Sequence, residues 1–241
     1  MSFIINPYIY GAGASYLGDD YSPDFLYSAG VQVDAADSDL IRVRRSSDSA
    51  ESDFNATEIA DGTLTTWTGA NDGFIVKMYN IGSGGATYDL VQSTAGNQPR
   101  IVNAGSLETK NSEGCAKFDG TNDYLSTGTG TLNTTSVSTF TAVSMDSTGV
   151  AGFYMQSKNN NSDSMRYACD TRLSPTRHFL VANGTNYFAD LSTNRNNTNM
   201  RLLTTFIDAS KNMSAFDNAA TGGTATYSGT SMDRDWETVS C

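Results

Sequence analysis

The stretch Phe74-Ile75-Val76-Lys77-Met78-Tyr79 is rich in β-branched and aromatic residues, and the turn-forming run Asn80–Gly85 follows it directly. Two further stretches, Phe140–Met145 and Arg201–Ile207, have a similar composition and similar polar boundaries. Runs of this kind are typical of β-strands. These three stretches therefore predict strands, and they make β-structure the dominant secondary structure of the chain.

Weaker strand candidates follow one another at short intervals, with Gly, Asn, Asp or Ser between them. Only two short stretches, Pro23–Ser28 and Gly62–Thr68, are predicted to be helical, with Asp61 as an N-cap. Many short strands without intervening helices predict an all-β, two-sheet antiparallel sandwich or jelly roll with one or two helical turns. The weaker candidates are Thr87–Val91, Tyr124–Ser126, Phe153–Gln156, Arg166–Cys169, His178–Val181, Tyr187–Leu191, Met213–Phe216 and Thr224–Tyr227.

Composition and charge narrow the function classes. The chain has 241 residues and a formal net charge of −11, which disfavours binding to nucleic acid. The one basic cluster, Arg42, Arg44 and Arg45, alternates with apolar residues and is predicted to be the solvated face of a strand. No apolar run reaches membrane-spanning length, and the short apolar start of the sequence predicts no signal peptide. Its 3 cysteines lack the spacing of a zinc site.

The ends of the chain differ from its centre. Residues 1–30 are dense in Tyr, Phe and Gly and are predicted to be an arm, which docks onto the sandwich or onto a neighbouring subunit. Residues 31–234 contain no linker and are predicted to form one sandwich domain. After about Arg234 the sequence does not read as a closing strand, so residues 235–241 are predicted to be a truncated or non-native end.

Two stretches resemble known domains. Residues 41–51, Ile-Arg-Val-Arg-Arg-Ser-Ser-Asp-Ser-Ala-Glu, and residues 73–84, Gly-Phe-Ile-Val-Lys-Met-Tyr-Asn-Ile-Gly-Ser-Gly, resemble the opening of the catalytic domain of arabinofuranosidase B. Residues 118–125, Phe-Asp-Gly-Thr-Asn-Asp-Tyr-Leu, are similar to a signature of laminin-G-like sandwiches. The resemblance covers roughly residues 38–234 and implies a concanavalin-A-like sandwich.

The same layout is similar to structural proteins of bacteriophages, notably marine ones. This resemblance implies a virion-associated protein of the tail-fibre or capsid-decoration type, made in the host cytoplasm, with a lectin-like domain. The partners that it implies are host-surface glycans and other virion proteins, and self-association stays open. Two alternatives remain: a glycoside hydrolase of arabinofuranosidase-like type, and a purely structural sandwich without a ligand.

The hydrolase alternative depends on a pair of carboxyl groups. A retaining glycosidase needs two carboxyls about 5–5.5 Å apart, one of them with a raised pKa. In arabinofuranosidase B the turn after the second strand reads Asp-Gln-Ser-Gly-Asn, whereas here residues 80–84 read Asn-Ile-Gly-Ser-Gly. The segment that resembles the nucleophile strand of that family, Met-Glu followed by apolar residues, is not found. The sequence therefore predicts no catalytic residue and no turnover of arabinofuranosides.

Asp119, Asn122 and Asp123 are the candidate metal ligands. They cluster on a predicted turn, and oxygen ligands at such close spacing suit Ca²⁺. The alternative is that they cap the turn by accepting hydrogen bonds from its own backbone. Calcium is the only cofactor that the sequence suggests.

A sugar site requires aromatic rings for stacking and amide groups for the hydroxyls. The sequence offers these residue types in its second half, where the Asn residues fall mainly on predicted loops. The alternative is that the rings pack within the sheets and the amides form turns. The candidate ligand-binding residues are Tyr154, Asn160, Tyr167, Asn183, Asn186 and Tyr187.

Overall fold

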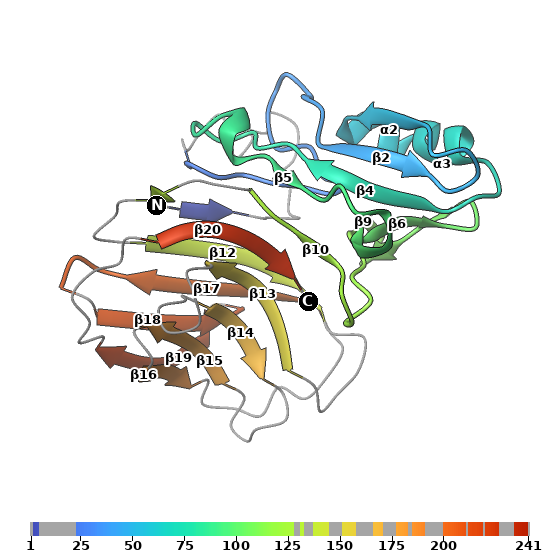
Figure 1. Ribbon diagram of the computed structural model, residues 1–241. Helices are drawn as coiled ribbons and strands as arrows, with labels where there is room; N and C mark the ends of the chain where they lie inside the picture. Colours follow the sequence, from blue (N-terminus) through green and yellow to red (C-terminus); the bar gives the residue numbers. More distant parts are fainter. Residues whose placement is uncertain are drawn as a thin grey trace. The chain divides into compact units, whose positions relative to one another are not determined.

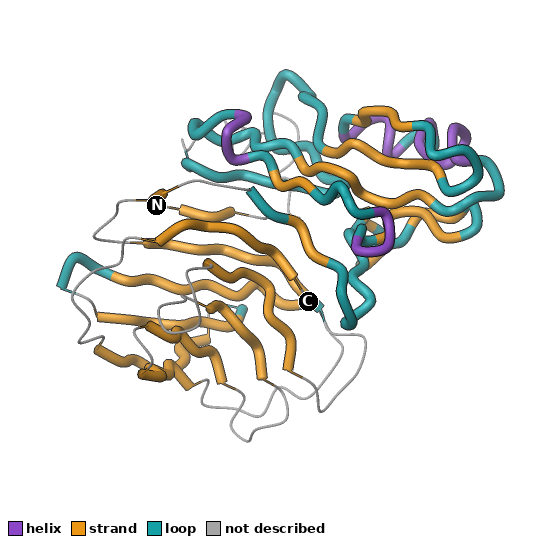
Figure 2. The backbone as a smooth tube through the Cα atoms, in the orientation of Figure 1, coloured by secondary structure: helices purple, strands orange, loops and turns teal. Residues whose placement is uncertain are grey.

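The computed structural model describes residues 2–4, 23–127, 131–132, 137–144, 151–157, 166–170, 177–182, 185–190, 200–210, 212–218, 220–226 and 234–240 (Figure 1). Most of these residues lie in strands of antiparallel sheets, and two short α-helices are found among them (Figure 2). The predicted all-β sandwich class is therefore confirmed. The chain divides into two compact units: unit 1 is Met1–Asn6 with Gly128–Cys241, and unit 2 is Pro7–Thr127.

One sheet of unit 1 has five strands in the order β1-β12-β17-β18-β19. Strand β1 runs parallel to β12, and the other neighbours are antiparallel. The sheet therefore combines a strand from the start of the chain with strands from its second half. The bounds are β1 Ser2–Ile4, β12 Val137–Val143, β17 Arg201–Ile207, β18 Asn212–Asp217 and β19 Ala220–Thr226.

The second sheet of unit 1 contains β20, β13, β14, β15 and β16 in that order, and β11 pairs with β20. Strand β16 contacts β18 and β19 of the first sheet, so the two sheets pack as a sandwich. The segment that was expected to be a truncated end forms β20. The bounds are β11 Thr131–Leu132, β13 Ala151–Ser157, β14 Arg166–Asp170, β15 Arg177–Ala182, β16 Thr185–Asp190 and β20 Arg234–Ser240.

Alternation along β12 and β17 sends one set of side chains into the interior. Thr139 of β12 pairs with Thr205 of β17, and both are buried. Leu203, two residues before Thr205, and Ala215, the partner of Thr205 on β18, are buried on the same face. Because strand side chains alternate between faces, Phe140 and Phe206 lie on the opposite face of this sheet. The two faces of the sheet therefore differ in composition.

Unit 2 is built on a sheet with the order β3-β2-β4-β6-β7, and β5 pairs with β4. Strands β8 and β9 form a separate hairpin. The strand bounds are β2 Ile41–Arg45, β3 Glu51–Phe54, β4 Gly73–Met78, β5 Leu90–Val91, β6 Arg100–Asn103, β7 Ser106–Leu107, β8 Thr109–Lys110, β9 Glu113–Gly114 and β10 Tyr124–Leu125. The helices are α2 Ala56–Ala60, α3 Thr63–Thr68, η1 Ala86–Tyr88 and η2 Ala95–Asn97.

Helices α2 and α3 pack on the apolar side of this sheet. Phe54 at the end of β3 packs edge-to-face on Trp67 of α3, with ring centroids 5.4 Å apart. A capping box starts α2: Asn55 accepts from the Glu58 amide, and the Glu58 side chain accepts from the Asn55 amide. The other face of the sheet carries the polar side chains.

Several local predictions are corrected. Residues 23–28 are not helical, because the Leu26 amide donates to the side chain of Asn80 rather than within a helical turn. Thr87–Val91 is divided between η1 and β5. Asp61 is the C-cap residue of α2 and Gly62 is the N-cap residue of α3, although the Asp61 carboxylate accepts from the Thr63 amide at the start of α3, as an N-capping side chain does. No helix among the described residues is long and apolar enough to cross a membrane.

Candidate functional site

A polar face on β2, β3 and β4 is the best-defined cluster of ionisable groups in unit 2. Ile41 and Val43 of β2 are fully buried, so the alternating Arg42 and Arg44 point to the other face. On β4 the register shifts between the partners of Arg42 and Val43, which leaves Val76 as the extra residue of a bulge. The bulge reverses the alternation, and it places Lys77 opposite Arg42 on the same polar face.

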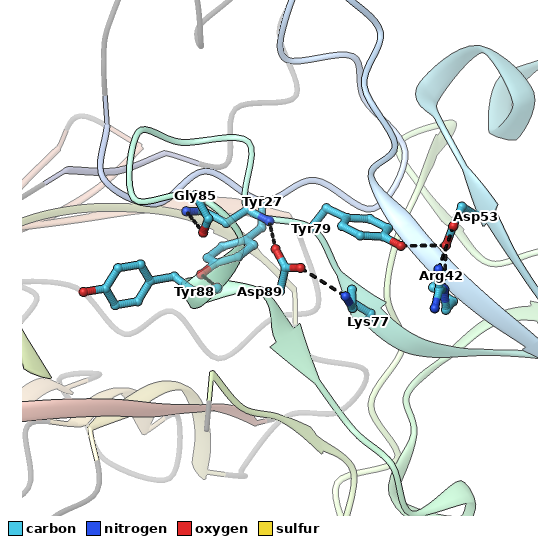
Figure 3. Close-up of polar contacts among 9 residues, drawn as sticks. Tyr27, Arg42, Asp53, Lys77, Tyr79, Gly85, Tyr88 and Asp89 are labelled. Atoms are coloured by element: carbon cyan, nitrogen blue, oxygen red, sulfur yellow. Dashed lines mark hydrogen bonds and ion pairs between the residues drawn. The ribbon is translucent and has the colours of Figure 1, made fainter. Parts of the chain in front are cut away.

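Asp53 is the centre of this face. Its carboxylate accepts from Arg42 Nε at 2.7 Å and from Arg42 Nη2 at 2.8 Å, and Tyr79 Oη donates to it at 2.7 Å (Figure 3). The hydrogen bond from Arg42 lowers the pKa of Asp53 below the usual value for an aspartate. Burial, followed by the hydrogen bond to Asp53, raises the pKa of Tyr79 to about 12. Asp53 is therefore an ionised carboxylate held in one orientation by two donors.

Lys77 and Asp89 extend the cluster along β4. Lys77 Nζ lies 3.2 Å from Asp89 Oδ2 and 4.9 Å from the centre of the Tyr79 ring. The Asp89 side chain is buried, and its Oδ1 accepts from the Asn80 amide at 2.9 Å. The ring of Tyr79 thus lies between the Arg42–Asp53 ion pair and the Lys77–Asp89 ion pair (Figure 3).

Asp39 is the second carboxyl group of this region. Asp39 is exposed; desolvation comes first among the causes that raise its pKa, and the negative charges of Asp53 and Glu58 come next. The pKa values of Asp39 and Asp53 are thus shifted in opposite directions. Two carboxyl groups whose pKa values are pushed apart in this way are what acid-base chemistry on a glycosidic bond requires.

The loop after β4 closes one end of the polar face. Asn80 Oδ1 accepts from the amides of Leu26 and Gly82, and Asn80 Nδ2 donates to the carbonyls of Asp24 and Gly85. Four hydrogen bonds from one side chain fix both the loop and the segment 23–28. In this chain the turn that resembles arabinofuranosidase B therefore has a structural role.

The predicted calcium ligands lie on a turn, and their oxygens serve that turn. Asp119 Oδ1 accepts from the amides of Thr121, Asn122 and Asp123, and Asp123 Oδ2 accepts from the Asp119 amide. These are the hydrogen bonds of the turn-capping alternative. Within the described part of the chain, no group of three or more His, Cys, Asp or Glu residues could hold a metal ion. Calcium binding at these residues stays a prediction.

The predicted sugar-binding residues belong to unit 1. The strands that carry Tyr154, Tyr167, Asn186 and Tyr187 are β13, β14 and β16 of one sheet. Asn160 and Asn183 lie outside the described residues. The structure therefore brings together the strands of four of the six residues, and their role in binding stays a prediction.

The polar face of unit 2 was not recognised from the sequence as a site. Arg42 was assigned to a solvated strand face, which is correct, but its partner Asp53 becomes visible only when the β2–β3 register is known. The spacing of Lys77 and Tyr79 was a usable signal, because both lie at the end of the strand predicted over Phe74–Tyr79. The bulge that aligns Lys77 with Arg42 has no clear sequence signature.

Solved structures with a similar fold include arabinofuranosidases, two of them of family GH54. A mutant soaked with 4-nitrophenyl α-L-arabinofuranoside has a TM-score of 0.62 at 10% identity, over 89% of this chain and 54% of that one. The enzyme soaked with a cyclic sulfate inhibitor has a TM-score of 0.62 at 11% identity, with the same coverage. A complex of an arabinofuranosidase with arabinofuranosyl-α-1,2-xylobiose has a TM-score of 0.57 at 12% identity, over 88% of this chain and 55% of that one.

These likenesses establish the fold, and this chain spans about half the length of each of those proteins. No protein-family model and no curated protein sequence matches it. The expected similarity to the arabinofuranosidase sandwich is confirmed at the level of fold. The hypothesis of a phage virion protein is wrong, because the solved structures that share the fold are glycoside hydrolases and the phage context has no support.

Proposed function

We propose that this chain is a glycoside hydrolase of arabinofuranosidase-like type. The observation that carries the proposal is the likeness of fold to GH54 enzymes over nearly nine-tenths of the chain. Two of those enzymes were solved with arabinofuranosyl ligands, which makes an α-L-arabinofuranoside the substrate class to test.

Asp39 and Asp53 are the proposed carboxyl pair. Asp39, with its raised pKa, would give its proton to the glycosidic oxygen as the bond to the anomeric carbon breaks. Asp53, ionised and oriented by Arg42 and Tyr79, would attack the anomeric carbon or activate the water that does so. In either case water completes the hydrolysis, and Asp39 recovers a proton.

Release of 4-nitrophenol from 4-nitrophenyl α-L-arabinofuranoside tests this proposal. We expect turnover by the wild-type chain, and a loss of about 10²–10⁴-fold in kcat for Asp39→Asn and Asp53→Asn. Asp48→Asn is the matched control, because Asp48 is an aspartate on the neighbouring turn whose carboxylate pairs with Arg45. It should keep full activity.

The outcomes separate the two parts of the proposal. Absence of turnover in the wild-type chain, as the sequence predicts, would contradict the hydrolase assignment. Turnover that survives both Asp39→Asn and Asp53→Asn would keep the enzyme class and reject this carboxyl pair. The pH profile adds a third criterion: kcat/KM should fall as the pH rises through the raised pKa of Asp39.

A further inference from the structure

Three phenylalanines form a continuous group on one face of the first sheet of unit 1. The rings of Phe140 and Phe206 lie 5.7 Å apart at 84°, and those of Phe206 and Phe216 lie 5.7 Å apart at 76°. They come from β12, β17 and β18, which are neighbours in the sheet (Figure 1). Edge-to-face contacts of this kind hold each ring in place. We call this group the phenylalanine platform.

The register explains how the platform is arranged. Thr204 of β17 pairs with Phe140 on one side and with Phe216 on the other, so two rings lie across a single strand from each other. Two strand spacings separate the Cα atoms of those residues by about 9.6 Å. Phe206 lies two residues further along β17 and keeps 38% of its surface exposed. The rings therefore extend across three strands and along the central one.

The platform is uncharged in a strongly acidic chain. The formal net charge is −11, yet the other described residues on this face of β12, β17 and β18 carry only hydroxyl, amide or aliphatic groups, as at the half-buried Ser138, Leu202 and Ser214 and at the buried Thr204. Phe206 is exposed and Phe140 and Phe216 are half-buried, and a contiguous apolar group that reaches the surface is typical of an interaction site. A neutral face of rings and hydroxyls matches a neutral sugar, whose CH groups contact rings and whose hydroxyls contact polar neighbours.

We infer that the phenylalanine platform binds a neutral polysaccharide, of the arabinose-substituted xylose type, at a place separate from the carboxyl pair in unit 2. The choice of polysaccharide rests on the proposed function, since the platform would hold the polymer from which arabinofuranosyl groups are removed. The neutral character of the face and its extent across three strands favour an uncharged chain of several sugars over a charged ligand.

Affinity electrophoresis in gels that contain soluble arabinoxylan tests the inference, with dextran gels as the reference. We expect arabinoxylan to retard the wild-type chain and the apparent Kd to rise about three- to tenfold for Phe206→Ala. Phe206→Trp keeps a ring and should retain binding. Tyr124→Ala is the matched control, because Tyr124 is an exposed aromatic residue of unit 2. It should bind like the wild type.

Other outcomes would overturn the inference. These are the absence of retardation of the wild-type chain, equal retardation of Phe206→Ala, and a change of oligomeric state on Phe206→Ala without a change in retardation. The last result, from sedimentation velocity, would assign the platform to contact with a second copy. Should Phe206→Ala unfold, Phe206→Ser and Phe140→Ser replace it. Turnover of the small aryl glycoside should be unchanged in all these variants, so a failure here is distinguishable from a failure of the proposed function.

Discussion

At the scale of single residues, Thr139 is an exception inside the sandwich. Its Oγ1 is buried and has no hydrogen-bond partner, and among the described residues it is the one buried side-chain nitrogen or oxygen without a partner. A buried polar group without a partner costs about 1–3 kcal/mol. Strand β12 therefore carries a local destabilisation at Thr139.

We expect Thr139→Val to stabilise the protein. Valine has nearly the same shape, favours strands and removes the hydroxyl that has no hydrogen-bond partner. The free energy of unfolding should therefore rise by about 1 kcal/mol and the Tm by roughly 2–4 °C. Thermal unfolding followed by circular dichroism measures this. Thr205→Val, at the cross-strand partner of Thr139, should give no such gain, and a lower Tm for Thr139→Val would contradict the prediction.

Asp39 gives a prediction that depends on pH. Its pKa is raised in the folded protein, so the folded state holds a proton in a range where the unfolded state has lost it. Stability therefore decreases as the pH rises through that range and stays lower above it. Asp39→Asn should stabilise the protein at pH 7, and the difference from the wild type should vanish below about pH 3.9, the ordinary aspartate pKa.

Urea unfolding at pH 7 and pH 3 tests this prediction, with Asp48→Asn beside it. Arg45 lowers the pKa of Asp48 to about 2, so its substitution should act in the opposite direction at neutral pH. A stabilised but inactive Asp39→Asn would fit a proposed catalytic carboxyl that reduces stability for the sake of function. A destabilised variant at pH 7 would show that Asp39 is structural.

The turn at Asp119 illustrates which residue-level features a sequence predicts. Asp and Asn at close spacing indicated either turn caps or metal ligands, and the capping hydrogen bonds are local, so they follow from residue type alone. The pair Arg42 and Asp53 is not local. It depends on which strands become neighbours, and composition carries no information on that choice.

At the scale of elements, the loop after β4 shows why an extended segment was mistaken for a helix. Residues 23–28 have a short apolar run that fits a helical turn, but Asn80 takes their backbone groups instead. Gly82 makes this possible, because a Cβ at that position would lie 2.5 Å from the Pro23 carbonyl oxygen and 2.7 Å from that of Asp24. Both contacts are with backbone, which cannot rotate away.

Gly82→Ala should therefore destabilise unit 2. We expect a loss of at least about 1–3 kcal/mol, in the range of other overpacked sites, and a lower urea midpoint. Gly96→Ala is the matched control: nothing lies within 4 Å of its added Cβ, so it should be neutral or slightly stabilising. Equal midpoints for the two variants would show that the loop can move away from residues 23–24.

Strands were predicted better than other elements. Arg201–Ile207 was predicted with the bounds that β17 has, and Phe74–Tyr79 was one residue out of step with β4. Both have hydrophobic patterns that hold along their whole length. Helix α2 was missed because it is a single capped turn, and its capping box, Asn55 with Glu58, was the available signal.

At the scale of the whole molecule, the class of fold followed from the sequence but the division at about residue 128 did not. Both units are made of strands, so the composition hardly changes where one ends and the other begins. Only the topology reveals that unit 1 is discontinuous, with Ser2–Ile4 pairing to β12 and unit 2 inserted between them.

Deletion of Ser2–Ile4 should affect unit 1 alone. The deletion leaves one edge of β12 without its parallel neighbour, and an open edge exchanges its amides faster and promotes association. Hydrogen exchange followed by mass spectrometry should show loss of protection in β12 and unchanged protection in β2 and β4. Loss of protection in both units would contradict this separation.

The insertion of unit 2 also has a consequence for folding kinetics. Strand β1 cannot pair with β12 until the ends of a very long loop meet, and closure of a loop becomes less costly as its effective length falls, by about 0.6 kcal/mol for each halving. If unit 2 collapses first, it shortens that loop and brings both ends of unit 1 nearer. Strands β2 and β4 would then gain protection from hydrogen exchange in an early phase, and β1 and β12 in a later one. Folding of the sandwich would thus depend on prior folding of the unit inserted into it.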